Sequence, residues 1–323
     1  MDILSVLNNE KNNKKNVVKY ARRAVAFCLI ACALIFITQI LVAVIAVFLL
    51  KRFPVEFFYT NLGSIVIDIP VYVLGILIPL LITTLLFNKF IPKSDFELPK
   101  RYTTRKPVLY VVGTIGVGYL VTMFMNACFK DFVERFSAPS EVIANTPIEI
   151  FLTFLLYAFL PAVLEELMFR GLLLKRLLPY GKHGAIFISA FLFGLVHIDP
   201  PRIIFATVFG LLIGYCYEYT GSLAMPMIIH FINNSISVAG SLVGEDLIAA
   251  SILSFVIIGF AITGIVFIIN ISINGIKKHK VSINKPLCIG YKLSMPKYAS
   301  LLVLNAVSIP FIVAFIYCFN LYF

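Results

Sequence analysis

The chain has 323 residues, of which 60% are hydrophobic and only 13% are charged, and its mean hydropathy is +0.97. This composition excludes an ordinary soluble domain and is typical of a helical membrane protein with several spans. The formal net charge of +11 does not indicate a nucleic-acid partner, because the basic residues lie between the apolar runs and not along one soluble face. The partner that the composition does predict is the lipid bilayer.

Long apolar runs predict an all-α fold, a polytopic transmembrane helical bundle. Such runs exceed what a tilted strand needs to cross a bilayer, so the spans are expected to be helices. Asp199-Pro200-Pro201-Arg202 separates two short runs, which predicts a tight helical hairpin that can lie inside the bundle. In chain order the nine expected spans are residues 24–50, 63–87, 108–129, 149–178, 184–198, 203–219, 223–241, 247–274 and 301–323.

The basic residues predict the orientation of the chain. Most of the 27 lysines and arginines fall in four segments: residues 1–23, 88–107, 175–182 and 275–300. An even number of expected spans separates these segments from one another, so all four face the same side of the membrane. By the positive-inside rule that side is the cytoplasm, so the N-terminus is expected inside and the C-terminus outside. The Ile-, Lys- and Asn-rich character favours the cell membrane of a bacterium. The oligomeric state is not predicted.

The most informative residues are charged ones within the span 149–178. Glu165 and Glu166 are adjacent, and Arg170 follows Glu166 by four residues. Charges inside a membrane span are costly and therefore rare without a function. Glu166 and Arg170 lie one helical turn apart, so they can meet on one face and neutralise each other. Glu165 is rotated about 100° from Glu166 and points elsewhere. It is expected to be a free carboxylate that can act as a general base.

Two later spans carry polar side chains at the same helical spacing. His197 follows Phe193 by four residues, so the aromatic ring can pack beside the imidazole and restrict it. His230 and Asn234 share one helix face, and both can donate hydrogen bonds. Together with Glu165, these groups can converge from three helices on one cavity within the membrane. Glycines that favour close backbone approach accompany them: Gly194, Gly210, Gly214 and Gly221.

Such a set of side chains is sufficient to hydrolyse an amide bond without a covalent intermediate. A carboxylate and an imidazole can orient and deprotonate a water, while an imidazole and an amide stabilise the developing oxyanion. No Gly-x-Ser-x-Gly sequence indicates a serine nucleophile. Structural explanations exist for each signal alone, since an intramembrane ion pair can be a packing clamp and a histidine can bond a neighbouring helix. Their occurrence in three segments favours a function.

Zinc-assisted hydrolysis is an alternative. Glu165, His197 and His230 are the donors of a His/His/Glu zinc shell. However, the chain lacks HExxH, and none of its six cysteines shows CxxC spacing. No cofactor is expected, and a divalent metal such as zinc remains the alternative.

At these residues the chain resembles the CAAX protease and bacteriocin-processing family of intramembrane endopeptidases. The family pattern of Glu-Glu-x-x-x-Arg, Phe-x-x-x-His and His-x-x-x-Asn occurs in order and covers about residues 149–241. It reads here as Glu165-Glu166-Leu-Met-Phe-Arg170, Phe193-Gly-Leu-Val-His197 and His230-Phe-Ile-Asn-Asn234.

The resemblance implies that Glu165 and His197 activate water and that His230 and Asn234 form the oxyanion site. Glu166, Arg170 and Phe193 then support these four catalytic residues. It implies a peptide or lipidated-peptide substrate, as in CAAX-box processing, peptide maturation or bacteriocin immunity, and leaves metal dependence open. The expected organisation is a basic cytoplasmic segment, three spans, the catalytic core and two further spans, at residues 1–23, 24–148, 149–241 and 242–323.

Two alternatives come from other functional classes. A proton-coupled transporter could use Glu165 and the histidines as a relay, although the chain shows no recognisable inverted repeat. A non-catalytic bacteriocin immunity protein would act by binding alone.

Overall fold

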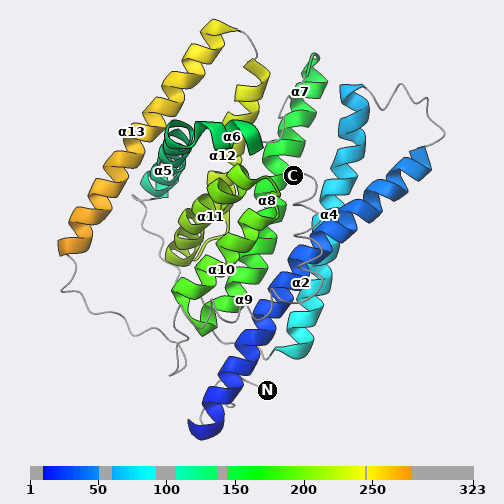
Figure 1. The fold of residues 1–323 in the computed structure, drawn as a ribbon, viewed down its shortest axis with the longest axis vertical. Coiled ribbons are helices and arrows are strands. Elements are labelled where there is room, and N and C mark those ends of the chain that lie inside the picture. Colours follow the sequence, from blue (N-terminus) through cyan, green and yellow to red (C-terminus); the bar gives the residue numbers. More distant parts are fainter. Residues whose placement is uncertain (1–9, 51–59, 92–106, 137–143, 244–245, 278–323) are drawn as a thin grey trace.

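The computed structural model describes residues 10–50, 60–91, 107–136, 144–243 and 246–277, and within them the chain forms helices and no strand (Figure 1). The expected all-α fold is therefore confirmed. The separate helices are α2 (Glu10–Leu50), α4 (Asn61–Phe90), α5 (Pro107–Cys128), α6 (Lys130–Phe136), α10 (Lys182–Leu195), α11 (Pro200–Thr220), α12 (Ala224–Val243) and α13 (Leu247–Lys277). One further helical rod, here called the central helix, consists of α7 (Pro147–Phe154), η1 (Leu155–Phe159), α8 (Leu160–Glu166), η2 (Leu167–Leu174), α9 (Lys175–Leu177) and η3 (Leu178–Tyr180).

Seven of the expected spans have helices long and apolar enough to cross a membrane, among the described residues. They are Val17–Phe48, Asn61–Phe90, Val111–Cys128, Pro147–Tyr180, Pro200–Thr220, Ala224–Val243 and Leu247–Ile269. The expected span 184–198 is the shorter apolar helix α10, and the last expected span, 301–323, lies outside the described residues. The chain is thus an integral multi-pass membrane protein, while its orientation stays a prediction.

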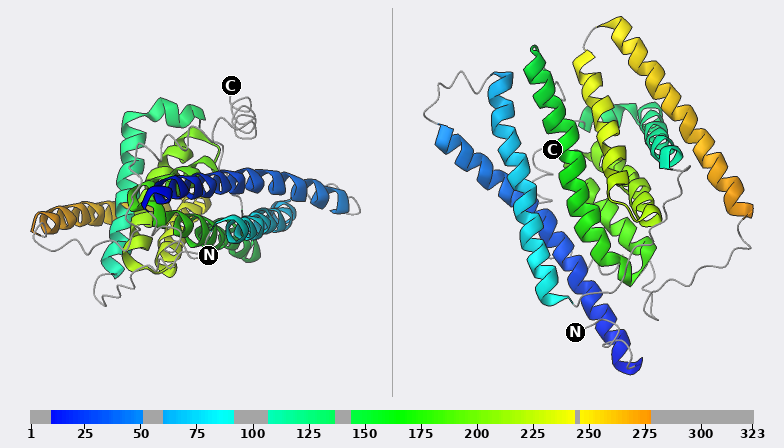
Figure 2. Two further views of the ribbon diagram at one scale, coloured as in Figure 1. Left: turned by 90° about the horizontal axis from the view of Figure 1, so that it is seen from below. Right: turned by 180° about the vertical axis from the view of Figure 1, so that it is seen from behind.

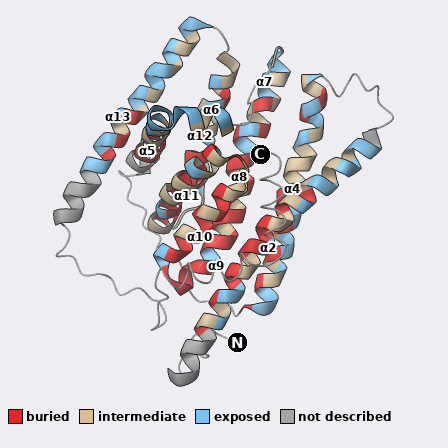
Figure 3. Cartoon of the chain, viewed as in Figure 1, coloured by how far each residue is buried: buried red, intermediate tan, exposed pale blue. Residues whose placement is uncertain are grey.

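Two helix pairs flank the centre of the molecule. The long helices α2 and α4 pack together on one side, and α5 packs against α13 on the other (Figures 1 and 2). The α5–α13 crossing is close because Gly116 and Gly264 face each other: a Cβ on Gly116 would lie 2.1 Å from the carbonyl oxygen of Phe260. Buried residues concentrate in α8, α10 and the middle of α2, whereas α13 is largely exposed (Figure 3). The middle of α2, the central helix, α10 and part of α11 therefore form the core.

The predicted hairpin of α10 and α11 is confirmed, with one correction to its connection. Pro200 and Pro201 do not separate the helices but form the first turn of α11, where a missing N–H costs nothing. The Asp199 carboxylate caps this turn by accepting a hydrogen bond of 2.9 Å from the backbone N–H of Arg202. The Lys182–Glu218 ion pair of 2.6 Å joins the start of α10 to the last turns of α11.

Gly194 allows the two hairpin helices to touch, as its sequence position predicts. A Cβ at this position would lie 2.1 Å from Thr207 Oγ1 and 2.7 Å from the carbonyl oxygen of Ile203. We expect Gly194→Ala to lower the stability of the fold by about 1–3 kcal/mol, the usual cost of overpacking. Gly259→Ala is the matched control, because a Cβ there meets nothing within 4 Å, and it should be neutral or stabilising. Thermal unfolding of both variants in detergent checks this, and equal midpoints would contradict the close contact.

Candidate active site

The central helix holds the glutamate pair in an irregular stretch of backbone. It begins with a capping box, in which Thr146 Oγ1 accepts a hydrogen bond from the Glu149 N–H and the Glu149 carboxylate accepts one from the Thr146 N–H. Further along, five residues of η1 and eight of η2 are wound as π-helix on either side of α8, which ends at Glu166. Such turns are rare and occur frequently at functional sites.

Glu166 lies at the centre of a fully buried network. Its Oε1 accepts hydrogen bonds of 2.9 Å from Arg170 Nη1 and of 2.9 Å from His230 Nδ1, and the side chains of Glu166 and Arg170 are 0% exposed. Arg170 Nη2 donates a third bond, of 3.2 Å, to the backbone carbonyl of Gly210 in α11. The pairing of Glu166 with Arg170 is thus confirmed, and the network also joins the central helix to α11 and α12.

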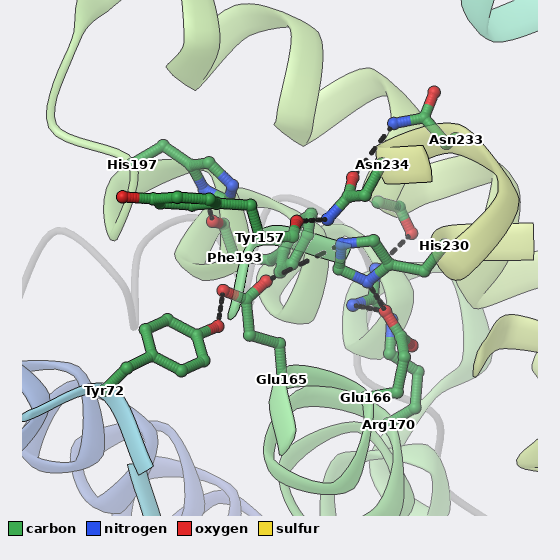
Figure 4. A network of polar contacts seen from close by, with 11 residues as sticks. Tyr72, Tyr157, Glu165, Glu166, Arg170, Phe193, His197, His230, Asn233 and Asn234 are labelled. Atoms are coloured by element: carbon green, nitrogen blue, oxygen red, sulfur yellow. Dashed lines mark hydrogen bonds and ion pairs between the residues drawn. The ribbon is translucent and has the colours of Figure 1, made fainter. Parts of the chain in front are cut away.

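Glu165 points away from Glu166 and Arg170, as the helical geometry predicts, but it is not free. Its Oε1 accepts a hydrogen bond of 2.5 Å from the phenol of Tyr72 in α4 (Figure 4). The expectation of an unpartnered carboxylate was therefore wrong for one oxygen, because α4 packs against α8 and brings a donor from 93 residues away. The other oxygen, Oε2, is buried without a hydrogen-bond partner and lies 3.9 Å from His230 Nε2.

His197 is held at the end of α10. Its Nδ1 lies 2.8 Å from the carbonyl oxygen of Phe193. A carbonyl only accepts, so Nδ1 carries the proton and Nε2 of the neutral ring has the lone pair. The next residue, Ile198, has a φ of 65°, a left-handed conformation that β-branched residues rarely adopt. This strained turn lets Asp199 cap α11 immediately after His197, and such strain is concentrated at functional sites.

His230 and Asn234 are one turn apart in α12, as predicted. His230 Nδ1 donates its hydrogen bond to Glu166, so the other ring nitrogen, Nε2, faces Glu165. Asn234 Nδ2 donates a hydrogen bond of 3.2 Å to the carbonyl oxygen of Tyr157. Pro161 has no N–H to donate to that carbonyl four residues earlier, so the proline in the central helix leaves this acceptor open to α12.

The Phe193 ring contacts His197, His230 and Arg170 and so brings these three side chains together. It packs edge-on against the imidazoles of His197 and His230, with centroids 5.0 and 5.7 Å apart. The Arg170 guanidinium lies 4.4 Å from the ring centroid on its face. The expected packing of Phe193 beside His197 is confirmed, and the same ring also restricts His230.

The arrangement separates a supporting layer from a reactive one. Glu166, Arg170 and Phe193 are buried: Glu166 and Phe193 contact the histidines, and Arg170 contacts Glu166 and Phe193. Glu165 is 13% exposed by side chain, and His197 and Asn234 are partly buried, so these groups border on accessible space. Such a site can remove a proton with Glu165 and donate hydrogen bonds from an imidazole and an amide.

The geometry also bears on the alternative of a metal site. Zinc needs at least three protein ligands about 2.0–2.3 Å from one point. The described residues contain no group of three His, Cys, Asp or Glu side chains placed to share a metal ion. Glu165 and His230 approach each other, but His197 does not complete a shell with them in this arrangement.

Sequence reasoning missed the contributions from outside the three motifs. Nothing marked Tyr72, because a tyrosine in an apolar span is commonly a packing residue. The Tyr157 carbonyl had a signal, since Pro161 four residues later removes its helical donor. The Gly210 carbonyl gave no signal in the sequence, because every residue of α11 has a backbone carbonyl.

Part of the chain is similar to a known protein family. Residues 147–236 match the family model described as type II CAAX prenyl endopeptidase Rce1-like. This segment of the chain is similar to the CAAX protease family. No curated protein and no solved structure matches the chain. The CAAX protease segment begins with α7 and ends within α12, so it contains all three polar motifs and the supporting network, while Tyr72 lies outside it. The general class that follows is a membrane-embedded CAAX-type endopeptidase.

Proposed function

We propose that this protein hydrolyses a peptide bond at the membrane by direct attack of water, with Glu165 as the general base. The observation that carries the proposal is the environment of Glu165 Oε2. This oxygen is buried, has no hydrogen-bond partner and lies 3.9 Å from His230 Nε2. An acceptor in this position can hold a water and take its proton, and His197, with its lone pair on Nε2, is the second acceptor for that water.

His230 and Asn234 are proposed to hold the oxygen of the scissile carbonyl. His230 in its protonated form donates from Nε2, since Glu166 balances the charge through Nδ1. The Asn234 amide has two N–H groups, of which Tyr157 takes one. Both donors are fixed before the reaction, which is how such sites stabilise a developing oxyanion.

The proposed reaction needs no covalent intermediate. The water oxygen forms a bond to the carbonyl carbon while Glu165 takes a proton. The tetrahedral intermediate then breaks its C–N bond, and the proton passes to the leaving amine. The products are a carboxylate and an amine. The proposed substrate is a peptide or a lipidated peptide, because Glu165 lies within an apolar span of the central helix.

Mapping of new peptide ends tests this function. Membranes carrying the full-length protein, Glu165→Ala or His197→Ala are compared by proteomics of N-terminal and C-terminal peptides. We expect a set of ends present with the unaltered protein and lost with both variants, while all three proteins insert equally. An arm with a chelator tests the zinc alternative, since ends lost on chelation and restored by zinc would require a metal. An unchanged set of ends in both variants would contradict the peptidase and favour the binding or transport alternatives.

A further inference from the structure

Tyr72 is the one residue outside the CAAX protease segment that the described hydrogen bonds join to Glu165. It lies in α4, and its phenol donates to Glu165 Oε1 over 2.5 Å. The phenol is the donor of this bond, and the carboxylate oxygen is the acceptor. A short bond to a charged acceptor is among the stronger hydrogen bonds in proteins.

The bond determines which oxygen of Glu165 faces the histidine. The terminal torsion of a glutamate is broad and roughly two-fold, so the two oxygens exchange easily when nothing holds them. Tyr72 holds Oε1, and Oε2 is left buried, unpartnered and directed at His230 Nε2. The phenol therefore selects one rotation of the carboxylate (Figure 4).

Contacts with helix α2 in turn fix the position of the α4 segment that carries Tyr72. Three residues after Tyr72, the Gly75 carbonyl lies 3.0 Å from the Thr38 hydroxyl in α2, which shares its single proton with the nearer Leu34 carbonyl of its own helix, 2.6 Å away. The helices touch at this point, since a Cβ on Gly75 would lie 2.4 Å from Gln39 Cγ. Helices α2 and α4 thus contact each other about one helical turn from Tyr72, whose phenol reaches the site.

We propose that Tyr72 is a positioning residue for Glu165, which makes the N-terminal helix pair α2–α4 part of the active site. This inference rests on the proposed function, because it assumes that Glu165 is the base. A carboxylate without its phenol partner samples rotations in which neither oxygen is aligned with the water. Misplacement of a catalytic group lowers the rate of the chemical step more than it lowers the affinity for substrate.

The test is Tyr72→Phe in the full-length protein in liposomes. The probe is an internally quenched peptide that spans a cut depending on Glu165. We expect kcat to fall roughly 10- to 100-fold with KM unchanged. Tyr119→Phe is the matched control, since the Tyr119 hydroxyl in α5 is buried and has no hydrogen-bond partner. The control should keep full turnover. Both variants should stay folded and inserted, with a lower unfolding midpoint for Tyr72→Phe, because only this variant loses a hydrogen bond.

A second measurement is independent of turnover. A hydrophobic carbodiimide modifies carboxyl groups within membranes, and mass spectrometry gives its rate at Glu165. In Tyr72→Phe this rate should rise severalfold, because Oε1 no longer accepts the phenol bond, whereas Tyr119→Phe should leave it unchanged. Unaltered kcat in Tyr72→Phe would overturn the inference while leaving the peptidase intact. If Glu165→Ala loses no cuts, the peptidase proposal fails and the labelling rate alone decides: an unchanged rate in Tyr72→Phe overturns the positioning role.

Discussion

Glu165→Gln is expected to slow peptide-bond cleavage by roughly 100- to 10,000-fold, the contribution of a positioned general base. Glutamine has the same shape, and its amide oxygen can still accept the bond from Tyr72. It cannot take a proton from water at the position of Oε2, however. The loss should therefore appear in the chemical step, with the protein folded and its affinity for substrate retained.

Single-turnover cleavage of a peptide that spans a mapped cut measures this effect. Glu134→Gln is the matched control, because Glu134 lies on α6 and pairs with Lys130 at 3.6 Å while both side chains are more than half exposed. This control should cleave at the unaltered rate. Full turnover in Glu165→Gln would remove Glu165 as the base and transfer that role to His197.

Glu166→Ala is expected to destabilise the protein by about 3–5 kcal/mol, the usual cost of leaving one member of a buried ion pair alone. The change leaves the fully buried Arg170 without its carboxylate and His230 Nδ1 without its acceptor. The same substitution in the exposed pair, Glu134→Ala, should cost no more than about 1 kcal/mol. Unfolding midpoints in detergent compare the two variants.

A double variant separates the two roles of Glu166. In Glu166→Leu/Arg170→Met no buried charge is left uncompensated, so much of the lost stability should return. Turnover should stay low, because His230 no longer has a carboxylate to fix its Nδ1 proton. A double variant that cleaves at the unaltered rate would show that Glu166 serves packing alone. One that is no more stable than Glu166→Ala would show that the Gly210 carbonyl, which loses its donor, dominates the cost.

The parts of the fold that follow from local pattern were predictable. Apolar runs long enough to cross a bilayer located the helices, and residue spacing predicted the contacts of Glu166 with Arg170 and of Phe193 with His197. Each of these contacts joins residues four apart, a separation that helical geometry alone makes adjacent. The helix boundaries shifted by a few residues, for example where Pro200 starts α11.

The site beyond those spacings was not predictable. Tyr72 and Glu165 are 93 residues apart, and His230 and Glu166 are 64 apart, so their meeting depends on which helices pack together. Sequence reasoning assigned Glu166 to Arg170 and left Glu165 free. The structure adds His230 to the first carboxylate and Tyr72 to the second.

The sequence by itself determined that this is a helical membrane protein with a glutamate pair, two histidines and an asparagine in three segments. Composition and spacing are sufficient for that, because both are local properties of the chain. Only the tertiary structure decided which oxygen of Glu165 remains available and which nitrogen of His230 faces it. A hydrogen bond selects one atom of a side chain, and its donor can come from any helix that packing brings within 3 Å or so.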